Sequence, residues 1–406
     1  MYVRLTEGLG GPIPRIISTQ SNLWRQMEPI DPRLGEPVTP TAACIAMPRW
    51  ITPVKHFVFP KTRGSASGSA KLEWKATSTV AELTPERLNP GFIFSATGGL
   101  ARDPNLDKAL KGLMAKLLAK KAPFNSEPFK TFVNHGGKIR VALVDLSTDT
   151  KLVLPEIAEF NSTQRTPGAS LAKVGLLYAA YQWLFDENVK NKGKGGKFEF
   201  ADTFRKALDG VCSNCDASRI SRRLSLAYIN SALWHAGLYH CRWGGIWLGA
   251  HYNEWDEKGR RWECDKIPYF YKGNCTSEGC HKDPSAGHLI VVTALSVATF
   301  FTLLAQGRLI DDESSQAVKD ILLLQPDHCG SRFKEGLKEA GRFAATDRLH
   351  SKIGVTRSLS HEGALIDRVS IGKKYVAVVL TVSPVAGGDV RQKLIAHLDE
   401  LIIANP

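Results

Sequence analysis

The stretch Arg165-Thr166-Pro167-Gly168-Ala169-Ser170-Leu171-Ala172-Lys173 decides how this chain is interpreted. Apolar residues recur at helical spacing after it: Val174, Leu176, Leu177, Ala180 and Leu184. This pattern predicts a buried helix over residues 170–188 whose first turn holds Ser170, with Lys173 on the same face. A serine becomes a nucleophile when a base takes its proton, and a lysine in an apolar turn can lose its own proton and act as that base. The N–H groups at the start of the helix would stabilise an oxyanion.

Simpler interpretations of the same residues remain open. The pattern Ser-x-x-Lys also occurs at Ser331–Lys334. The motif at Ser170 is therefore also compatible with a surface turn that carries a solvated lysine. Another alternative is the nucleophile elbow of an α/β-hydrolase, Gly168-Ala-Ser170-Leu-Ala172, which needs a buried strand just before the serine. Residues 161–167 are polar and end in a proline, which disfavours that strand.

The order of elements predicts one sheet built from both ends of a domain. Residues 1–103 are interpreted as a Pro/Gly-rich N-terminal extension, and residues 104–406 as the folded domain, with a helical lobe over about 170–338. A strand over Ile139–Leu146 is predicted to return as a hairpin through Leu152–Leu154. Helices are predicted over 105–121, 217–236, 288–306, 313–324 and 390–403, and strands over 349–355, 363–369 and 375–382. The expected fold class is α/β, an antiparallel sheet flanked by helices with the helical lobe inserted.

Charge and hydropathy limit the partners. The formal charge is +13, and it gathers in local patches that we interpret as solvated faces. No nucleic-acid motif accompanies these patches, so no nucleic-acid partner is predicted, and no apolar run is long enough for a membrane span. Residues 1–18 show no signal peptide. The localisation is therefore left open, periplasmic if the true start is upstream and cytoplasmic otherwise.

The eight cysteines are too few for a disulfide scaffold. Two disulfides and a zinc clip both remain open for the group Cys241, Cys264, Cys275 and Cys280, which has His240 and His281 beside it. Cys212-Ser-Asn-Cys215 is a lone Cys-x-x-Cys and is weak evidence for redox chemistry. No metal and no cofactor are predicted for the candidate site.

A lysine and a glycine stand on the first C-terminal strand, in His350-Ser-Lys352-Ile-Gly354. The lysine offers a cation and the glycine permits close approach of a substrate backbone. Ser170-x-x-Lys173 follows the hairpin, and Lys352-Ile-Gly354 precedes two more strands and a terminal helix. In this order of motifs the chain resembles the serine β-lactamase and penicillin-binding-protein superfamily, and most closely its class A branch. The resemblance covers residues 104–406.

The resemblance implies a third motif, Ser-Asp-Asn, in the helical lobe. Its best match is Ser213-Asn-Cys-Asp-Ala-Ser218, in which Ser213 would pass protons to the leaving group and Cys215 replaces the asparagine. Tyr228-Ile-Asn230 is a competing candidate because it resembles the Tyr-x-Asn of class C relatives. We prefer Ser213, because residues 228–237 resemble the helix that follows the motif in class A.

The resemblance also assigns roles to individual residues. The predicted catalytic residues are Ser170, Lys173, Ser213 and Lys352, and the predicted substrate-binding residues are Gly354, Val355 and Asn214. The backbone N–H groups of Ser170 and Val355 would bind the oxyanion. Ile353 stands where the family has a hydroxyl, and no Glu-x-x-Leu-Asn follows Gly237, with Glu254 the nearest acidic candidate. These departures disfavour efficient β-lactamase activity.

The function implied is serine acyl transfer, through an acyl-enzyme, on an amide, ester or β-lactam-like substrate that is a small molecule or peptide. The alternative is a catalytically weak or inactive penicillin-binding-like protein that binds a peptide or cell-wall fragment. Ile353 and Cys215 favour this alternative. The sequence leaves the substrate and the oligomeric state open.

Overall fold

The structure, a computed structural model, describes residues 103–147, 155, 157–190, 197–240, 244–249, 251–252, 290–326, 329–385 and 387–405. Almost all of the N-terminal extension lies outside these residues, as do the four grouped cysteines, His281 and Glu254. None of the helices that are described has the length and apolar character needed to cross a membrane.

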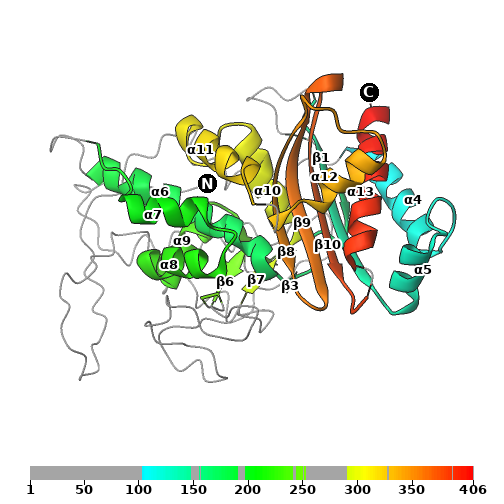
Figure 1. Cartoon of the computed structure of the whole chain (residues 1–406), viewed down its shortest axis with the longest axis horizontal. Helices are drawn as coiled ribbons and strands as arrows, with labels where there is room; N and C mark the ends of the chain where they lie inside the picture. The colour runs from blue at the N-terminus through cyan, green and yellow to red at the C-terminus, as the bar shows by residue number, and fades with distance from the viewer. Residues whose placement is uncertain are drawn as a thin grey trace, which may run out of the picture.

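A five-stranded antiparallel sheet with the order β2-β1-β10-β9-β8 forms the centre of the domain (Figure 1). Its strands are β1 (Lys138–Asp145), β2 (Ile157–Phe160), β8 (Arg348–Val355), β9 (Leu359–Arg368) and β10 (Lys373–Val382). In the pairing of β1 with β10, Lys138 lies opposite Val382. The predicted antiparallel sheet from both chain ends is therefore confirmed. The described strand that returns along β1 is β2, whereas Leu152–Leu154 lies outside the described residues.

Helices cover both faces of this sheet because both faces are apolar. Along β1, Val141 and Leu143 face one core, and Ala142 and Val144 face the other. The first core lies under α4 (Pro104–Leu118), α5 (Glu127–Asn134), α12 (Arg332–Glu339) and α13 (Gly387–Ala404). The second core lies under α10 (Ala294–Ala305), which joins the sheet to the helical lobe (Figure 1).

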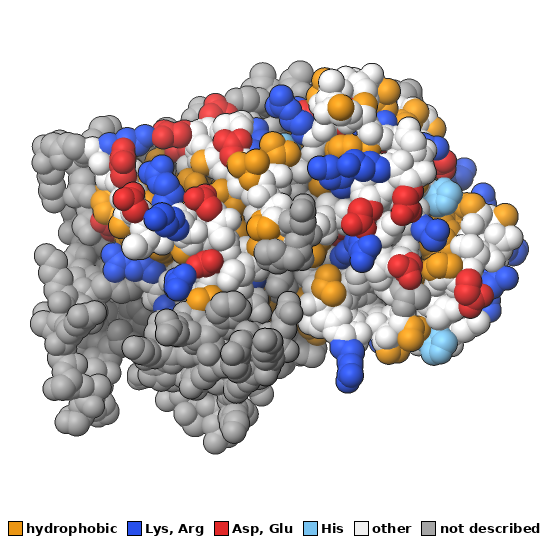
Figure 2. All heavy atoms as spheres, in the orientation of Figure 1, with side chains coloured by type: hydrophobic (Ala, Val, Ile, Leu, Met, Phe, Trp, Pro, Cys, Tyr) orange, Lys and Arg blue, Asp and Glu red, His pale blue; other side chains and the backbone are white. Residues whose placement is uncertain are grey.

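The helical lobe is the inserted part of the chain. It contains η3 (Ala169–Lys173), α6 (Val174–Lys190), α7 (Asp202–Asp209), α8 (Asn214–Leu224), α9 (Leu226–His235) and α11 (Asp312–Leu323). Short strands line its lower part: β3 (Thr166–Pro167), β4 (Tyr239–His240), β5 (Gly244–Gly245), β6 (Trp247–Leu248) and β7 (Ile290–Val292). On the face shown in Figure 2, basic and acidic side chains are interspersed over the described elements.

Two predicted helices differ from the structure for reasons of backbone conformation. The helix predicted over 217–236 is divided into α8 and α9 at Ser225, whose φ of +67° is incompatible with a continuous right-handed helix. The helix predicted over 288–306 begins only at Ala294, where Thr293 and Ser296 form a capping box. The apolar residues just before it form strand β7, because periodicity alone does not separate a short buried strand from a helix.

A buried ionic cluster ties the sheet to its C-terminal helix. Arg368 on β9 lies 3.0 Å from Asp347 and 2.7 Å from Asp399, and the side chains of both aspartates are fully buried. The hydroxyl of Tyr375 donates to Asp399 at 2.8 Å. The cluster therefore links β9, β10, α13 and the segment that enters β8.

Candidate active site

The turn that presents Ser170 is a short 3-10 helix, η3, which leads into α6. The sequence predicted Ser170 in the first turn of the α-helix, whereas the structure places it in the 3-10 turn that precedes α6. Ala169 has a φ of +43°, a left-handed conformation that is uncommon for a residue with a Cβ and that concentrates at functional sites. His361 Nε2 donates to the carbonyl of Pro167 at 2.9 Å, and the hydroxyl of Tyr252 donates to the carbonyl of Ala169 at 3.2 Å. These two side chains hold the turn from both sides.

Lys173 is fully buried, which contradicts the solvated-lysine interpretation of this motif. Its Nζ lies 2.7 Å from the carbonyl oxygen of Cys212 and 2.8 Å from Oδ1 of Asn214. It also lies 4.7 Å from the centroid of the Tyr252 ring. Burial lowers the pKa of Lys173 well below its ordinary value, and the nearby charge of Lys352 lowers it further.

The hydrogen bonds of Lys173 match those of a neutral amine. A neutral amine has two N–H donors and one lone pair, and the two acceptors, Cys212 and Asn214, account for both donors. The lone pair then remains to accept a proton. Within the described part of the chain, no residue forms a hydrogen bond with the Ser170 hydroxyl, so its proton is available for transfer.

Strand β8 packs directly against the nucleophile turn. A Cβ placed on Gly354 would lie 2.7 Å from the backbone nitrogen of Leu171, so only glycine permits this approach. Lys352 lies two residues earlier on the same face, and its Nζ donates to the carbonyl of Ile353 at 3.1 Å. Burial lowers the pKa of Lys352 to about 8, against the opposing effect of Glu362. The structure thus brings Asn214 and the lysine-bearing strand together at η3, the turn that holds Ser170 and Lys173.

The end of β8 also offers a backbone donor. The N–H of Thr356 donates to Leu359 on β9 at 2.9 Å. Because N–H groups along a strand alternate in direction, the N–H of Val355 points to the opposite side, the open edge of the sheet. Val355 is 53% exposed. This arrangement leaves the Val355 N–H unpaired with β9, as an oxyanion donor would require.

The middle motif is arranged differently from its prediction. Ser213 caps α8, and its hydroxyl oxygen accepts from the backbone N–H of Cys215 at 3.1 Å and of Asp216 at 3.4 Å. The side-chain amide that reaches Lys173 belongs to Asn214. The sequence pattern had placed the motif's amide at Cys215, whereas the structure has it one residue earlier, at Asn214. The motif's serine position then falls on Cys212 rather than on Ser213.

The two competing motifs have structural roles. Asn230 exchanges two hydrogen bonds with the backbone of Leu248, and Tyr228 donates to Asp186 at 2.8 Å. In the second Ser-x-x-Lys, Ser331 caps α12 by accepting from the backbone N–H of Lys334 at 3.0 Å, and the Lys334 side chain is exposed. The buried environment of Lys173 is therefore what separates the two motifs.

Tyr252 and His361, which contact the turn that presents Ser170, were not found by the sequence reasoning. His361 lies in Ser360-His361-Glu362, a polar triplet near the start of strand β9 whose residues are all buried, and the sequence would show it as polar residues just before the apolar run Ala364-Leu365-Ile366. Tyr252 stands in a long aromatic segment with no periodicity, so no local pattern distinguishes it from its aromatic neighbours.

Cys212, whose carbonyl accepts from Lys173, is joined by a disulfide to Cys329, 117 residues away in sequence. The bridge connects the start of α8 to the segment before α12. The lone Cys-x-x-Cys of the sequence is therefore not an isolated redox pair. Its first cysteine is a structural link beside the candidate site.

We expect Cys329→Ala to lower the free energy of unfolding by about 2–4 kcal/mol, because the bridge constrains the unfolded chain. Acylation of Ser170 should also slow, because the loop that holds Lys173 loses its anchor. Thermal unfolding with and without dithiothreitol measures the first effect. Dithiothreitol should lower the melting temperature of the native protein by more than that of the variant, and an equal shift in both would contradict the role of this bridge.

Comparisons with known proteins give similarity of structure only. No protein-family profile and no curated protein matches the chain. A β-lactamase from Sphaerobacter thermophilus is similar at 15% identity and a TM-score of 0.47, over 73% of this chain and 99% of that one. An acyl-enzyme complex of a PBP-A variant with penicillin G is similar at 12% identity and a TM-score of 0.47, over 75% and 98%. A class A β-lactamase from Bacteroides cellulosilyticus is similar at 13% identity and a TM-score of 0.47, over 74% and 98%.

Proposed function

We propose that this protein is a serine hydrolase that works by acyl transfer, with Ser170 as nucleophile and Lys173 as base. The observation that carries the proposal is the state of Lys173. It is fully buried, its pKa is lowered, and two acceptors occupy two of its donors. A buried lysine with a lowered pKa, three residues after a serine whose hydroxyl makes no hydrogen bond within the described part of the chain, is the arrangement that nucleophilic catalysis needs.

The steps follow from the positions of these groups. Lys173 takes the proton of Ser170, and the serine oxygen attacks an amide or ester carbonyl. The carbonyl oxygen gains negative charge, which the N–H groups of Ser170 and Val355 would stabilise at the edge of β8. The bond from the carbonyl carbon to the leaving group then breaks, the leaving group departs with the proton that Ser213 and Lys352 relay from Lys173, and an acyl-serine remains. Water then releases the acid.

The leaving group needs a proton donor. In the resemblance, a serine hydroxyl relays this proton, and the aligned position is Cys212, whose sulfur is in a disulfide. Ser213 still has its O–H proton, because it acts only as an acceptor when it caps α8. Ser213 and the ammonium of Lys352 are therefore the proposed donors to the leaving group.

The substrate class is proposed as amides, esters or β-lactam-like compounds of small-molecule or peptide size, with Asn214 and Gly354 contacting the substrate. The alternative function is peptide or cell-wall-fragment binding without turnover. The disulfide at Cys212 favours it, because it leaves no hydroxyl at the position where the resemblance has a serine.

The lifetime of the acyl-serine separates the two functions. Purified protein would be mixed with a penicillin, a cephalosporin and a panel of simple esters, and its intact mass followed with time. A hydrolase shows an adduct that appears and decays while product accumulates. A binding protein with a reactive serine shows a stable adduct, and an unreactive one shows none in a folded sample, which would contradict the proposed acyl transfer.

We expect the rate of acylation by a carboxylate-bearing β-lactam to fall as pH rises through about 8. Lys352 has a pKa lowered to about 8, so it is a cation below that pH and loses its charge above it. Lys173 must instead be neutral, so the rise in rate on the acidic side begins well below the ordinary lysine pKa. Rates of adduct formation between pH 5 and 10 measure both limbs.

Lys352→Arg is the matched control for this profile. Arginine stays protonated throughout the range, so the decline above pH 8 should disappear in the variant. A decline of the same size in Lys352→Arg would assign it to another group and contradict the role given to Lys352.

A further inference from the structure

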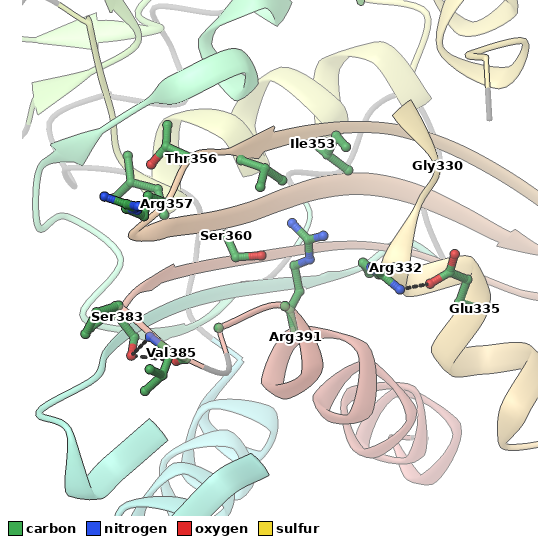
Figure 3. A pocket seen from close by; sticks show the side chains of 15 residues that line it. Gly330, Arg332, Glu335, Ile353, Thr356, Arg357, Ser360, Ser383, Val385 and Arg391 are labelled. Atoms are coloured by element: carbon green, nitrogen blue, oxygen red, sulfur yellow. Dashed lines mark hydrogen bonds and ion pairs between the residues drawn. The ribbon is translucent and has the colours of Figure 1, made fainter. Parts of the chain in front are cut away.

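A cavity of about 460 Å³ lies behind β8, on the side of the strand away from Ser170. It is bounded by the β8–β9 hairpin, the segment from β10 into α13, and the start of α12 (Figure 3). Side chains alternate along β8, so Ile353 and Val355 face this cavity while Lys352 and Gly354 face η3. The cavity is therefore separate from the candidate active site, although both share one strand.

Arg391, on the first turns of α13, supplies a buried cation to this cavity. Its side chain is almost fully buried and lines the cavity. One terminal nitrogen donates to the carbonyl of His361, and Nε lies 3.3 Å from Glu362. The Nε makes no hydrogen bond, so the buried guanidinium is incompletely satisfied.

The Ser360 hydroxyl is a second polar group that points into the cavity. Figure 3 shows the hydroxyl of Ser360 and the guanidinium of Arg391 directed into the same space. Among the described residues, none forms a hydrogen bond with the Ser360 hydroxyl, although the backbone carbonyl of Ser360 accepts from Thr381 at 2.5 Å. The cavity thus presents a hydroxyl donor beside a guanidinium whose donors are not all used.

The amino end of α13 adds to the positive electrostatic potential in the cavity. The helix has 18 residues, and the glycine pair Gly387-Gly388 at its start leaves the first backbone N–H groups uncovered by side chains. A Cβ on Gly388 would meet only the Ser360 hydroxyl, at 3.7 Å, so there is room at this end of the helix. The positive end of the helix dipole and Arg391 therefore lie on the same side of the cavity.

The remaining wall combines apolar residues, paired polar groups, and the exposed Thr356 and Arg357 of the β8–β9 turn. Leu359, Val385 and the two β8 side chains form the apolar part. Arg332 and Glu335 line the rim as an ion pair with a distance of 2.7 Å between charged atoms. An occupant would therefore carry one negative head group and a short apolar body.

We propose that this cavity binds a small organic anion, an aryl or alkyl carboxylate or phosphate monoester. Arg391, the Ser360 hydroxyl and the first turn of α13 hold the head group, and Ile353, Val355 and Leu359 contact the apolar body. This site does not depend on the chemistry of Ser170.

Calorimetric titration of the full chain with three probes tests the site. The probes are benzoate, phenyl phosphate and the neutral benzamide. We expect at least one anion to bind ten times or more tightly than benzamide, and the stronger anion identifies the head group. Gly388→Asp should weaken binding of that anion at least tenfold, because it places a negative charge over Ser360. Ser360→Ala should weaken its binding several-fold.

Gly388→Asp should fold, because an acidic residue near the start of a helix is favourable. The matched control is Gly112→Asp, on the exposed face of α4 with no neighbouring atom near the new Cβ, and it should leave binding unchanged. Equal binding of benzamide, no binding of either anion, or unchanged anion affinity in both Gly388→Asp and Ser360→Ala would overturn the proposal. Loss of anion binding in Lys352→Met, with full binding in Gly388→Asp, would place the anion in the catalytic cleft and also overturn it.

Discussion

Replacing Lys173 with methionine should reduce the rate of Ser170 acylation by about a hundred- to ten-thousand-fold, the usual contribution of a general base. Methionine fills a similar volume but cannot accept a proton. The residual rate would come from the backbone donors that remain in place. The measurement is the rate of adduct formation with a fluorophosphonate or an activated ester, followed by intact mass.

The stability of the same variant distinguishes a lost base from a damaged fold. Removing a buried amine relieves its desolvation, although the carbonyl of Cys212 and the amide of Asn214 lose their donor. We therefore expect little change in melting temperature. Lys334→Met, in the exposed second Ser-x-x-Lys, is the matched control and should retain the full acylation rate. Full activity in Lys173→Met would remove the proposed base from the mechanism.

Arg368→Met should lower the free energy of unfolding by about 3–5 kcal/mol, the cost of breaking a buried ion pair from one side. Arg368 is the shared partner of Asp347 and Asp399, whose side chains are fully buried. Without it, Asp347 loses its ion-pair partner, and Asp399 keeps only the more distant Arg342, at 3.6 Å. Urea or thermal unfolding, read by circular dichroism, gives the magnitude.

A second arginine provides the control for this effect. Arg332 pairs with Glu335 at 2.7 Å, but both side chains are about half exposed. Arg332→Met should change the free energy of unfolding by less than about 1 kcal/mol, as surface pairs usually do. Similar losses in the two variants would show that burial of the cluster is not what makes Arg368 important.

The sheet could be predicted from the sequence because its strands carry a strong local signal. Strand β10 is rich in Val residues, and both of its faces are buried, so composition alone indicates a central strand. The ends of the helices could not be predicted where a single backbone angle or an N-cap determines them. The break at Ser225 and the capping box at Thr293 depend on local geometry that apolar periodicity does not report.

The candidate site was partly predictable because local sequence patterns also determine some of its contacts. Spacing within a motif brings Ser170 and Lys173 together, and the packing of Gly354 on Leu171 follows from a small residue on an edge strand. The assignment of Asn214 could not be read from spacing, because the cap formed by Ser213 shifts the motif by one residue. Tyr252 and the bridge from Cys212 to Cys329 depend on contacts between distant segments, which no local pattern encodes.

Peptide mapping after treatment with a fluorophosphonate at neutral pH tests the central claim most directly. That claim is that Lys173, buried and with a lowered pKa, takes the proton of the Ser170 hydroxyl. We predict a single adduct on the peptide that contains Ser170 in the folded protein, strongly reduced in Lys173→Met and retained in Lys334→Met. An unmodified Ser170 in a folded sample, or an adduct that is equally strong in Lys173→Met, would contradict the account.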